Sequence, residues 1–212
     1  MAEFRTSPLV VATVSGILPA DERDRRVALS SFAASAERPA VPMREVVCYE
    51  CGKRTSVPAA ALSAACTHCH THLNMVDVEL KPGSRRLTIR TVGKVSVQPD
   101  TVLSHLSIVC SDMHIAGQVS GSFRCFGTLT FANSMRVEGA VKAAHLIVEK
   151  GAEVVLAEGA EVKSAFISGR LSGVLEARGP VTVARGGELL GTCRSPQLEV
   201  QPGGRYSGPP AA

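Results

Sequence analysis

The stretch "VEGAVKAAHLIVEKGAEV", residues 137–154, decides the fold class. Small and branched apolar residues alternate along it, and glycines interrupt the alternation. A related stretch, "LLGTCRSPQLEVQPGGRY" at residues 189–206, follows downstream and places Gly191 where Gly139 stands. Alternation with a period of two is typical of β-strands, because successive side chains point to opposite faces. The recurrence therefore predicts a chain of equivalent strand-and-turn units.

The repeat has a short and nearly constant period. Gly151, Gly169, Gly186 and Gly203 recur at almost equal intervals, and Val148, Phe166, Val183 and Val200 follow the same spacing. Glycines at fixed offsets indicate corners. Short strands and corners at a period of roughly 17 to 18 residues are typical of a β-solenoid, here with three strands per turn. Residues 84–208 have room for roughly seven turns, which form a rod about 30 Å long.

The composition agrees with a thin, regular core. Hydrophobic residues make up 45% of the 212 residues, which is enough for a core and argues against wholesale disorder. Aromatic residues are only 4%, and tryptophan is absent. We therefore expect a narrow column of inward Val, Leu, Ile and Ala that needs no aromatic rings.

The net charge of +4 is unevenly distributed. Residues 1–94 hold 13 bases and 9 acids, whereas residues 95–212 hold 10 of each. Residues 81–94 carry five bases and no acid, so they form either a solvated joint or a surface that contacts anionic lipid or nucleic acid through charge. The G-x-x-x-x-G-K-[ST] phosphate-binding loop is absent, so no nucleotide is expected.

Four cysteines have the spacing of a zinc ribbon. "CYECGK" (48–53) and "CTHC" (66–69) give C-x2-C-x14-C-x2-C, in which each pair forms a turn that points two thiolates at one ion. We expect Cys48, Cys51, Cys66 and Cys69 to bind one structural Zn²⁺, with Gly52 supplying a positive φ in the first turn. Two redox-active pairs, or thiols without a chemical role, are the alternatives. The nearby His68, His70 and His72 are competing ligands, although four thiolates already fill a structural site.

The remaining histidines and cysteines have structural interpretations. Alternation places His145 on the outer surface, and neither a cleft nor a partner for it is evident. Cys193 aligns with Val141 at an inward position, and Cys110 and Cys125 are expected at comparable positions. None of these residues predicts a catalytic site.

The N-terminal part is expected to lie outside the two folded modules. Its apolar stretch at residues 7–18 is too short to span a membrane and lacks the basic cluster of a signal peptide. Next to uncompensated positive charge, it predicts peripheral contact with a membrane surface. The residues for this contact are Leu9, Val10, Val11, Ile17 and Leu18.

The chain thus divides into four parts. Residues 1–43 are expected to be flexible, residues 44–80 to form the zinc ribbon, residues 84–208 to form the β-helix, and residues 209–212 to be frayed. The turn residues "KPG" at 81–83 mark the boundary between the two folded modules.

Residues 84–208 resemble the bactofilins, the polymer-forming cytoskeletal proteins of bacteria. The similarity lies in the glycine-punctuated turns, "VEGAV" (137–141), "ISGRLSG" (167–173) and the closing "LEVQPGGRYSG" (198–208). It implies an all-β, right-handed, three-sided parallel β-helix that polymerises without nucleotide, often at the inner membrane surface, and helps to set cell shape. The added zinc ribbon departs from the simplest members, and Tyr206 stands where the family usually has Phe.

The leading hypothesis is therefore a cytoplasmic, structural protein that joins end to end with copies of itself. A solenoid end exposes unpaired backbone groups and apolar core, and we expect Tyr206, Leu198 and Val200 to form the polymer interface. A second hypothesis makes the ribbon an adaptor for nucleic acid or protein, with the rod as its scaffold. A third, an acyltransferase of the hexapeptide-repeat class, would need a strict six-residue repeat and a catalytic histidine in a protruding loop. We therefore expect no enzymatic activity.

Overall fold

The computed structural model describes residues 41–209, and its chain from Val41 onward forms one compact unit. All regular elements in this part are β-strands, which confirms the all-β prediction. No helix among these residues is long and apolar enough to cross a membrane. The predicted flexible segment 1–43 lies outside the described residues except for its last three. The five residues predicted to contact a membrane, Leu9, Val10, Val11, Ile17 and Leu18, all lie outside them.

Two small antiparallel hairpins form the cysteine-containing module. β1 (Met43–Val47) pairs with β2 (Arg54–Pro58), and β3 (Ser63–Ala65) pairs with β4 (His72–Asn74). Each hairpin carries one cysteine pair at its turn, because Cys48 and Cys51 follow β1 while Cys66 and Cys69 follow β3. This is the arrangement that a zinc ribbon requires.

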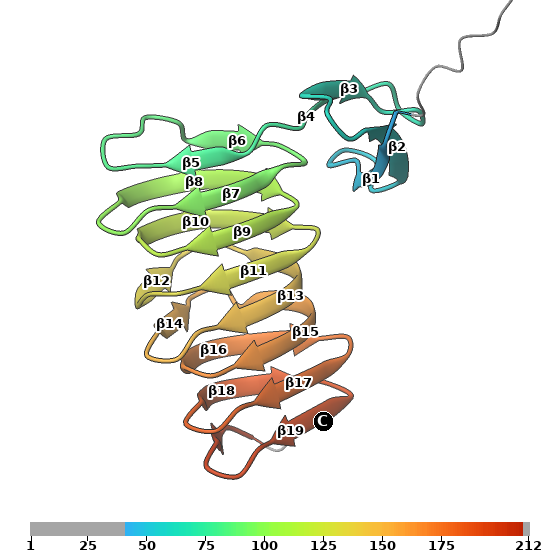
Figure 1. Ribbon diagram of the computed structural model, residues 1–212. Coiled ribbons are helices and arrows are strands. Elements are labelled where there is room, and N and C mark those ends of the chain that lie inside the picture. The colour runs from blue at the N-terminus through green and yellow to red at the C-terminus, as the bar shows by residue number, and fades with distance from the viewer. Residues whose placement is uncertain (1–40, 210–212) are drawn as a thin grey trace, which may run out of the picture. The chain divides into compact units, whose positions relative to one another are not determined.

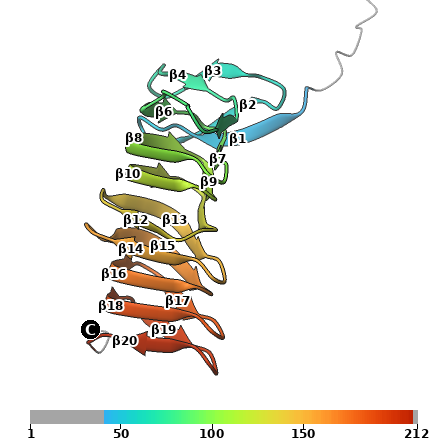
Figure 2. The same cartoon turned by 90° about the vertical axis from the view of Figure 1, so that its left-hand side faces the viewer.

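The other strands form a parallel β-solenoid, in which each turn of the chain stacks on the one before (Figure 1, Figure 2). The strands are β5 (Val78–Leu80), β6 (Thr88–Arg90), β7 (Lys94–Val97), β8 (Val102–Cys110), β9 (Asp112–Ile115), β10 (Gln118–Cys125), β11 (Thr128–Phe131), β12 (Met135–Val137), β13 (Val141–Val148), β14 (Glu153–Leu156), β15 (Ala160–Ile167), β16 (Arg170–Ala177), β17 (Pro180–Val183), β18 (Glu188–Arg194), β19 (Gln197–Val200) and β20 (Arg205–Ser207).

The strand pairings define three faces, as the sequence predicts. Face A runs through β5, β7, β9 and β11, the ends of β13 and β15, then β17 and β19. Face B runs through β6, the ends of β8 and β10, the beginnings of β13 and β15, and the ends of β16 and β18. Face C contains β12, β14, the beginnings of β16 and β18, and β20. The longer strands therefore bend around a corner from one face to the next.

The core is a single column of inward side chains. On face A, the register stacks Val78, Val95, Met113, Leu129, Leu146, Ala165, Val181 and Leu198. Most of the column is aliphatic, as expected, but Phe123 and Phe131 are also fully buried in it. The expectation of a core without aromatic rings is therefore wrong in detail.

Two details of the predicted repeat need correction. The stack on face A has eight members instead of seven turns, because β5, which lies in the segment expected to form the ribbon, pairs with β7 and forms the first rung. The predicted alignment of Phe166 with Val148 is also wrong. Ile167 occupies that inward position, and Phe166 points outward with 43% of its surface exposed. The steps between stacked positions are unequal in length, so a uniform period misplaces the residues that follow a long turn.

The glycines between faces C and B lie where two stacked turns approach each other closely. Gly191 has φ +110°, and a Cβ on it would lie 2.3 Å from the carbonyl oxygen of Gly173 in the preceding turn. Gly186 also has a positive φ, +81°, but an added Cβ would have no heavy atom within 4 Å. Alanine substitutions at the two positions therefore distinguish the free-energy cost of the backbone conformation from that of the steric clash.

This pair gives a direct test of the stacking. Gly186→Ala is expected to cost about 1–2 kcal/mol, because only the left-handed conformation is penalised. Gly191→Ala should cost at least twice as much, because the methyl group also pushes two turns apart. Thermal unfolding followed by circular dichroism would measure both. Equal losses of stability in the two variants would contradict the stacking at this corner.

Candidate metal centre

Four cysteine thiols converge between the two hairpins of the ribbon. The Sγ atoms of Cys48, Cys51, Cys66 and Cys69 all lie within 4.8 Å of one another. The separation is 3.6 Å between Cys48 and Cys69 and 3.7 Å between Cys51 and Cys66. A tetrahedral ion with metal–sulfur bonds of about 2.3 Å places its sulfur atoms about 3.8 Å apart. The four residues predicted from the spacing therefore fit one tetrahedral metal ion.

The two cysteine turns are built in the same way. The N–H of Gly52 donates to the carbonyl of Cys48 at 2.9 Å, and the N–H of His70 donates to the carbonyl of Cys66 at 3.0 Å. Gly52 has φ +69°, as expected, and His70 has φ +58° at the equivalent position. His70 therefore takes the place of a glycine in the second turn, and it keeps the backbone conformation that the turn requires.

Hydrogen bonds to sulfur favour the thiolate form that binds metals. The N–H groups of Glu50 and His68 each lie 3.4 Å from the sulfur of Cys48 and Cys66, respectively. The side chain and the backbone of Thr71 lower the pKa of Cys69 to about 6. Because a coordinating cysteine must be deprotonated, these contacts favour metal binding at Cys48, Cys66 and Cys69. The backbone hydrogen bond of Lys53 lowers the pKa of Cys51, but desolvation and hydrogen bonds with the other three thiols outweigh it and raise this pKa to about 11.

The three histidines near the site are not part of the cluster. Nε2 of His68 lies 3.1 Å from the carbonyl oxygen of Arg54, and His70 and His72 are exposed. Among residues 41–209, only the four cysteines form a group able to hold a metal ion. Four protein ligands complete a tetrahedron and leave no position for water or substrate, so the geometry is that of a structural site.

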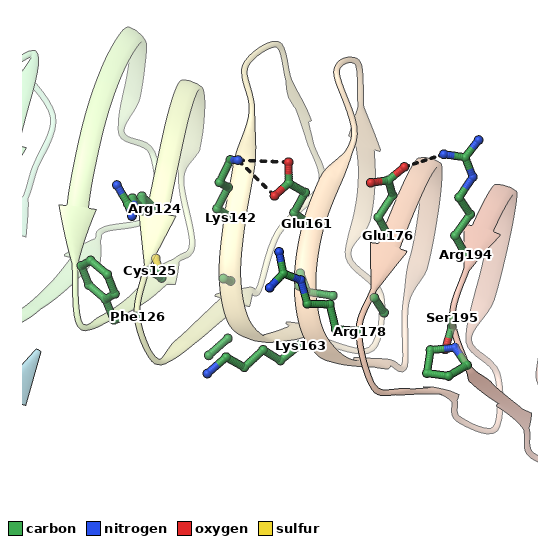
Figure 3. A pocket seen from close by; sticks show the side chains of 15 residues that line it. Arg124, Cys125, Phe126, Lys142, Glu161, Lys163, Glu176, Arg178, Arg194 and Ser195 are labelled. Carbon is green, nitrogen blue, oxygen red and sulfur yellow. Dashed lines mark hydrogen bonds and ion pairs between the residues drawn. The ribbon is translucent and has the colours of Figure 1, made fainter. Parts of the chain in front are cut away.

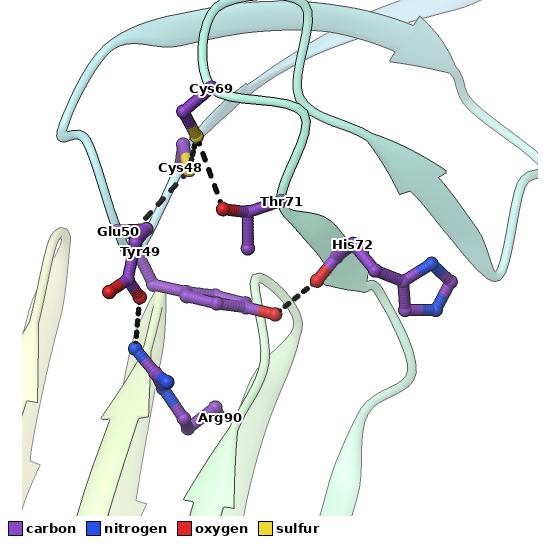
Figure 4. A network of polar contacts seen from close by, with 7 residues as sticks. All are labelled: Cys48, Tyr49, Glu50, Cys69, Thr71, His72 and Arg90. Atoms are coloured by element: carbon purple, nitrogen blue, oxygen red, sulfur yellow. Dashed lines mark hydrogen bonds and ion pairs between the residues drawn. The ribbon is translucent and has the colours of Figure 1, made fainter.

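The sequence did not predict how the ribbon is attached to the solenoid. The guanidinium of Arg90, on β6, stacks 4.9 Å from the ring centre of Tyr49 and forms an ion pair with Glu50 (Figure 4). The hydroxyl of Tyr49 donates to the carbonyl of His72. The apolar cluster of the ribbon also includes Val92, with Val109 and Phe126 packed against it. Arg90 belongs to the basic stretch 81–94, which its ion pair partly neutralises.

The predicted polymer-interface residues lie at the C-terminal end of the solenoid. Tyr206 pairs with Leu189 in the preceding turn. Both Tyr206 and Leu198 pack against the core. Val200 follows Val183 in the register and is 42% exposed. Their neighbours one turn earlier, Leu189 and Val183, are completely buried.

The other predicted positions agree with the structure. His145 is exposed on face A, with Nδ1 2.8 Å from the hydroxyl of Ser164. Cys110, Cys125 and Cys193 are buried in the core. The sulfur atoms of Cys110 and Cys125 lie 3.4 Å apart on paired positions, and their hydrogen bond together with burial raises the pKa of Cys125. The three buried thiols therefore act as small core residues.

Comparisons with known proteins identified no relative of this chain. No protein-family model, no curated protein and no solved structure matches the chain. The class of protein is thus defined by its own geometry, as a parallel β-solenoid that carries a four-cysteine ribbon.

Proposed function

We propose that this protein is a structural, non-enzymatic scaffold whose rods join end to end into filaments without nucleotide. The observation that carries the proposal is the open C-terminal rung. Among the described residues, β19 pairs only with β17 and β20 pairs only with β18. Within the described residues, the outer N–H and C=O groups of these strands have no strand partner, which is the situation in which strands associate with another chain.

The apolar surface of this rung supports the same function. Val200 is 42% exposed, and Tyr206 and Leu198 are half-buried. Their partners in the preceding turn, which are Val183, Leu189 and Val181, respectively, are 0% exposed. A second rod would cover these side chains as the next turn does elsewhere in the stack. Burial of a large apolar side chain contributes about 2 kcal/mol, so three such residues supply a substantial driving force.

A ladder of charges on face C ends at the same rung. Glu153, Arg170, Glu188 and Arg205 occupy paired positions in successive turns. Arg170 lies 3.4 Å from Glu153 and 2.9 Å from Glu188, and these carboxylates raise the pKa of Arg170. Arg205, on the last rung, extends this alternation. It offers a partner rod a position for a carboxylate.

The resemblance to bactofilins supports this proposal, because that family is built of such rods and polymerises without nucleotide. On this reading the protein is a cytoplasmic scaffold for cell shape or envelope organisation, in peripheral contact with the inner membrane. Four thiolates without an oxygen ligand are typical of structural zinc, so we assign Zn²⁺ to the ribbon. The role of the ion is to hold together a module with a small core of its own.

A second candidate function is recruitment of a protein by the ribbon. Met43 on β1 and Leu62, just before β3, are 56% and 69% exposed, respectively. Exposed apolar side chains on a small module are suited to contact with a partner. This function is compatible with filament formation, since the ribbon and the C-terminal rung are separate parts of the chain.

Electron microscopy of the purified full-length protein tests the main proposal. Negatively stained samples without nucleotide should contain filaments whose number and length increase with protein concentration. Addition of ATP or GTP should leave them unchanged. Monomeric rods at every concentration would contradict the proposal.

A further inference from the structure

Five of the ten basic residues in the segment 95–212 lie along one corner of the solenoid. Residues 95–212 contain ten bases and ten acids in all. Five of those bases but only two of the acids line a groove of about 810 Å³ at the corner between faces B and A (Figure 3). The composition of this region is balanced, so only the fold shows that its charge is segregated. We call this feature the corner groove; its charged residues are Arg124, Lys142, Glu161, Lys163, Glu176, Arg178 and Arg194.

Small side chains produce the hollow. The floor contains Cys125, Ala143, Val162, Ala177 and Ser195, which are at most 9% exposed. Ala143, Val162 and Ala177 occupy paired positions, and Cys125 and Ser195 directly follow Arg124 and Arg194, which pair with residues of the adjacent turns. Ala144 lies beside this column, and the ring of Phe126 and Pro196 stand at the two ends of the groove. Since turns are about 4.8 Å apart, five of them give a groove about 19 Å long. An extended peptide of about six residues has the same length.

The charges of the groove are only partly compensated. Lys142 pairs with Glu161 at 3.0 Å, and Arg194 pairs with Glu176 at 2.7 Å. Lys163 and Arg178 are exposed on adjacent turns, and among the described residues neither forms an ion pair. Arg124 lies over the ring of Phe126, 5.3 Å from its centre, and likewise has no carboxylate partner in the described part of the chain. Three cationic side chains therefore surround an apolar floor.

We propose that the corner groove binds an extended segment of a partner protein in which acidic and apolar residues alternate. Successive side chains of an extended segment point in opposite directions. One set then packs on the alanine-rich floor while the other reaches Lys163, Arg178 and Arg124. This recruitment site is independent of end-to-end assembly, because the groove lies along the side of the rod.

The same features make nucleic acid a poorer fit. The carboxylates of Glu161 and Glu176 belong to the rim and would repel a continuous phosphate backbone, whereas a peptide can present neutral or basic residues to them. Binding of single strands also relies on aromatic rings that stack with bases. The groove has one ring, Phe126, and Arg124 already covers it.

Fluorescence anisotropy with the full-length protein tests the proposal. The probe is a labelled octapeptide that alternates glutamate with leucine or valine. Peptides with lysine in place of glutamate, or with the same residues grouped into an acidic and an apolar half, serve as controls. We expect the alternating acidic peptide to bind at least about tenfold more tightly than either control. Equal binding of all three peptides would overturn the proposal.

Two sets of variants locate the binding. Lys163→Gln with Arg178→Gln should weaken binding by at least about tenfold, because two charge-assisted contacts are lost. Lys150→Gln with Arg185→Gln removes the same charge from exposed positions outside the groove and should change binding less than twofold. Ala144→Leu should also weaken binding by filling the floor. The rod should accommodate this change, because the neighbouring turns already carry Phe126 and Lys163 at that corner.

Three results would overturn the proposal. One is equal weakening by the two double variants, which would show a general effect of charge. Another is unchanged affinity in Lys163→Gln with Arg178→Gln. The last is tighter binding of labelled oligothymidine than of the peptide, with loss of that binding in the groove variant, which would assign the groove to nucleic acid.

Discussion

Tyr206→Arg is expected to yield folded rods that form few or no filaments. Tyr206 continues the inward column that contains Val154, Leu171 and Leu189 in the preceding turns of face C. In the last rung no further turn covers it within the described residues, so an arginine there can extend into water without disturbing the turns behind it. Where two rods meet, however, the charge would have to be buried against apolar core, and this costs several kcal/mol.

Negative-stain microscopy and circular dichroism together measure this effect. The β-sheet signal should be unchanged while the filaments disappear. Ser207→Arg is a matched control, because it adds the same charge to the same strand at an exposed neighbouring position on the opposite side of β20. Filaments of normal length in Tyr206→Arg would place the joint elsewhere, such as along the sides of the rod.

Cys48→Ser is expected to abolish metal binding and unfold the ribbon while most of the solenoid remains intact. The wild-type protein, purified without chelator, should contain one zinc ion per chain. The free energy of binding a structural zinc ion is about 10–16 kcal/mol, which is far more than the small core of a ribbon contributes. Removal of one thiolate should therefore release both hairpins, residues 43–74.

The structure changes one part of this expectation. The sequence suggests that ribbon and rod have separate cores, but the ribbon packs on Val92, Val109 and Phe126 and holds Arg90 against Tyr49. Loss of the metal should thus also loosen the first turns of the solenoid. Hydrogen exchange should increase strongly over residues 43–74, moderately in β5 and near Val92 and Val109, and little beyond β13.

Elemental analysis and hydrogen exchange of a control variant complete this test. Cys193→Ser removes a buried thiol of the rod that lies outside the four-cysteine cluster, so it should retain one ion per chain. Absence of zinc from the wild-type protein would contradict the metal assignment. Global unfolding of Cys48→Ser would instead show that the solenoid depends on the ribbon throughout.

Local sequence patterns are enough to predict the class of each module. Alternation within "VEGAVKAAHLIVEKGAEV" and the recurring glycines predict stacked strands, because the direction of a side chain and the conformation of a corner depend on neighbouring residues. The spacing of Cys48, Cys51, Cys66 and Cys69 predicts the metal cluster for the same reason. Two residues between cysteines place both sulfur atoms on one side of a tight turn, whatever the rest of the chain does.

Local patterns do not reveal which residues of different turns lie side by side; the folded structure is needed for this. The turns differ in length, so a small error in one turn moves a residue such as Phe166 from the core to the surface. The sequence did not identify β5 as the first rung of the solenoid, because this assignment depends on its pairing with β7, which is distant in the sequence. The pairing of Arg90 with Glu50 and the collection of bases in the corner groove were missed for the same physical reason. Contacts between distant residues depend on the stacking register, which local spacing does not encode.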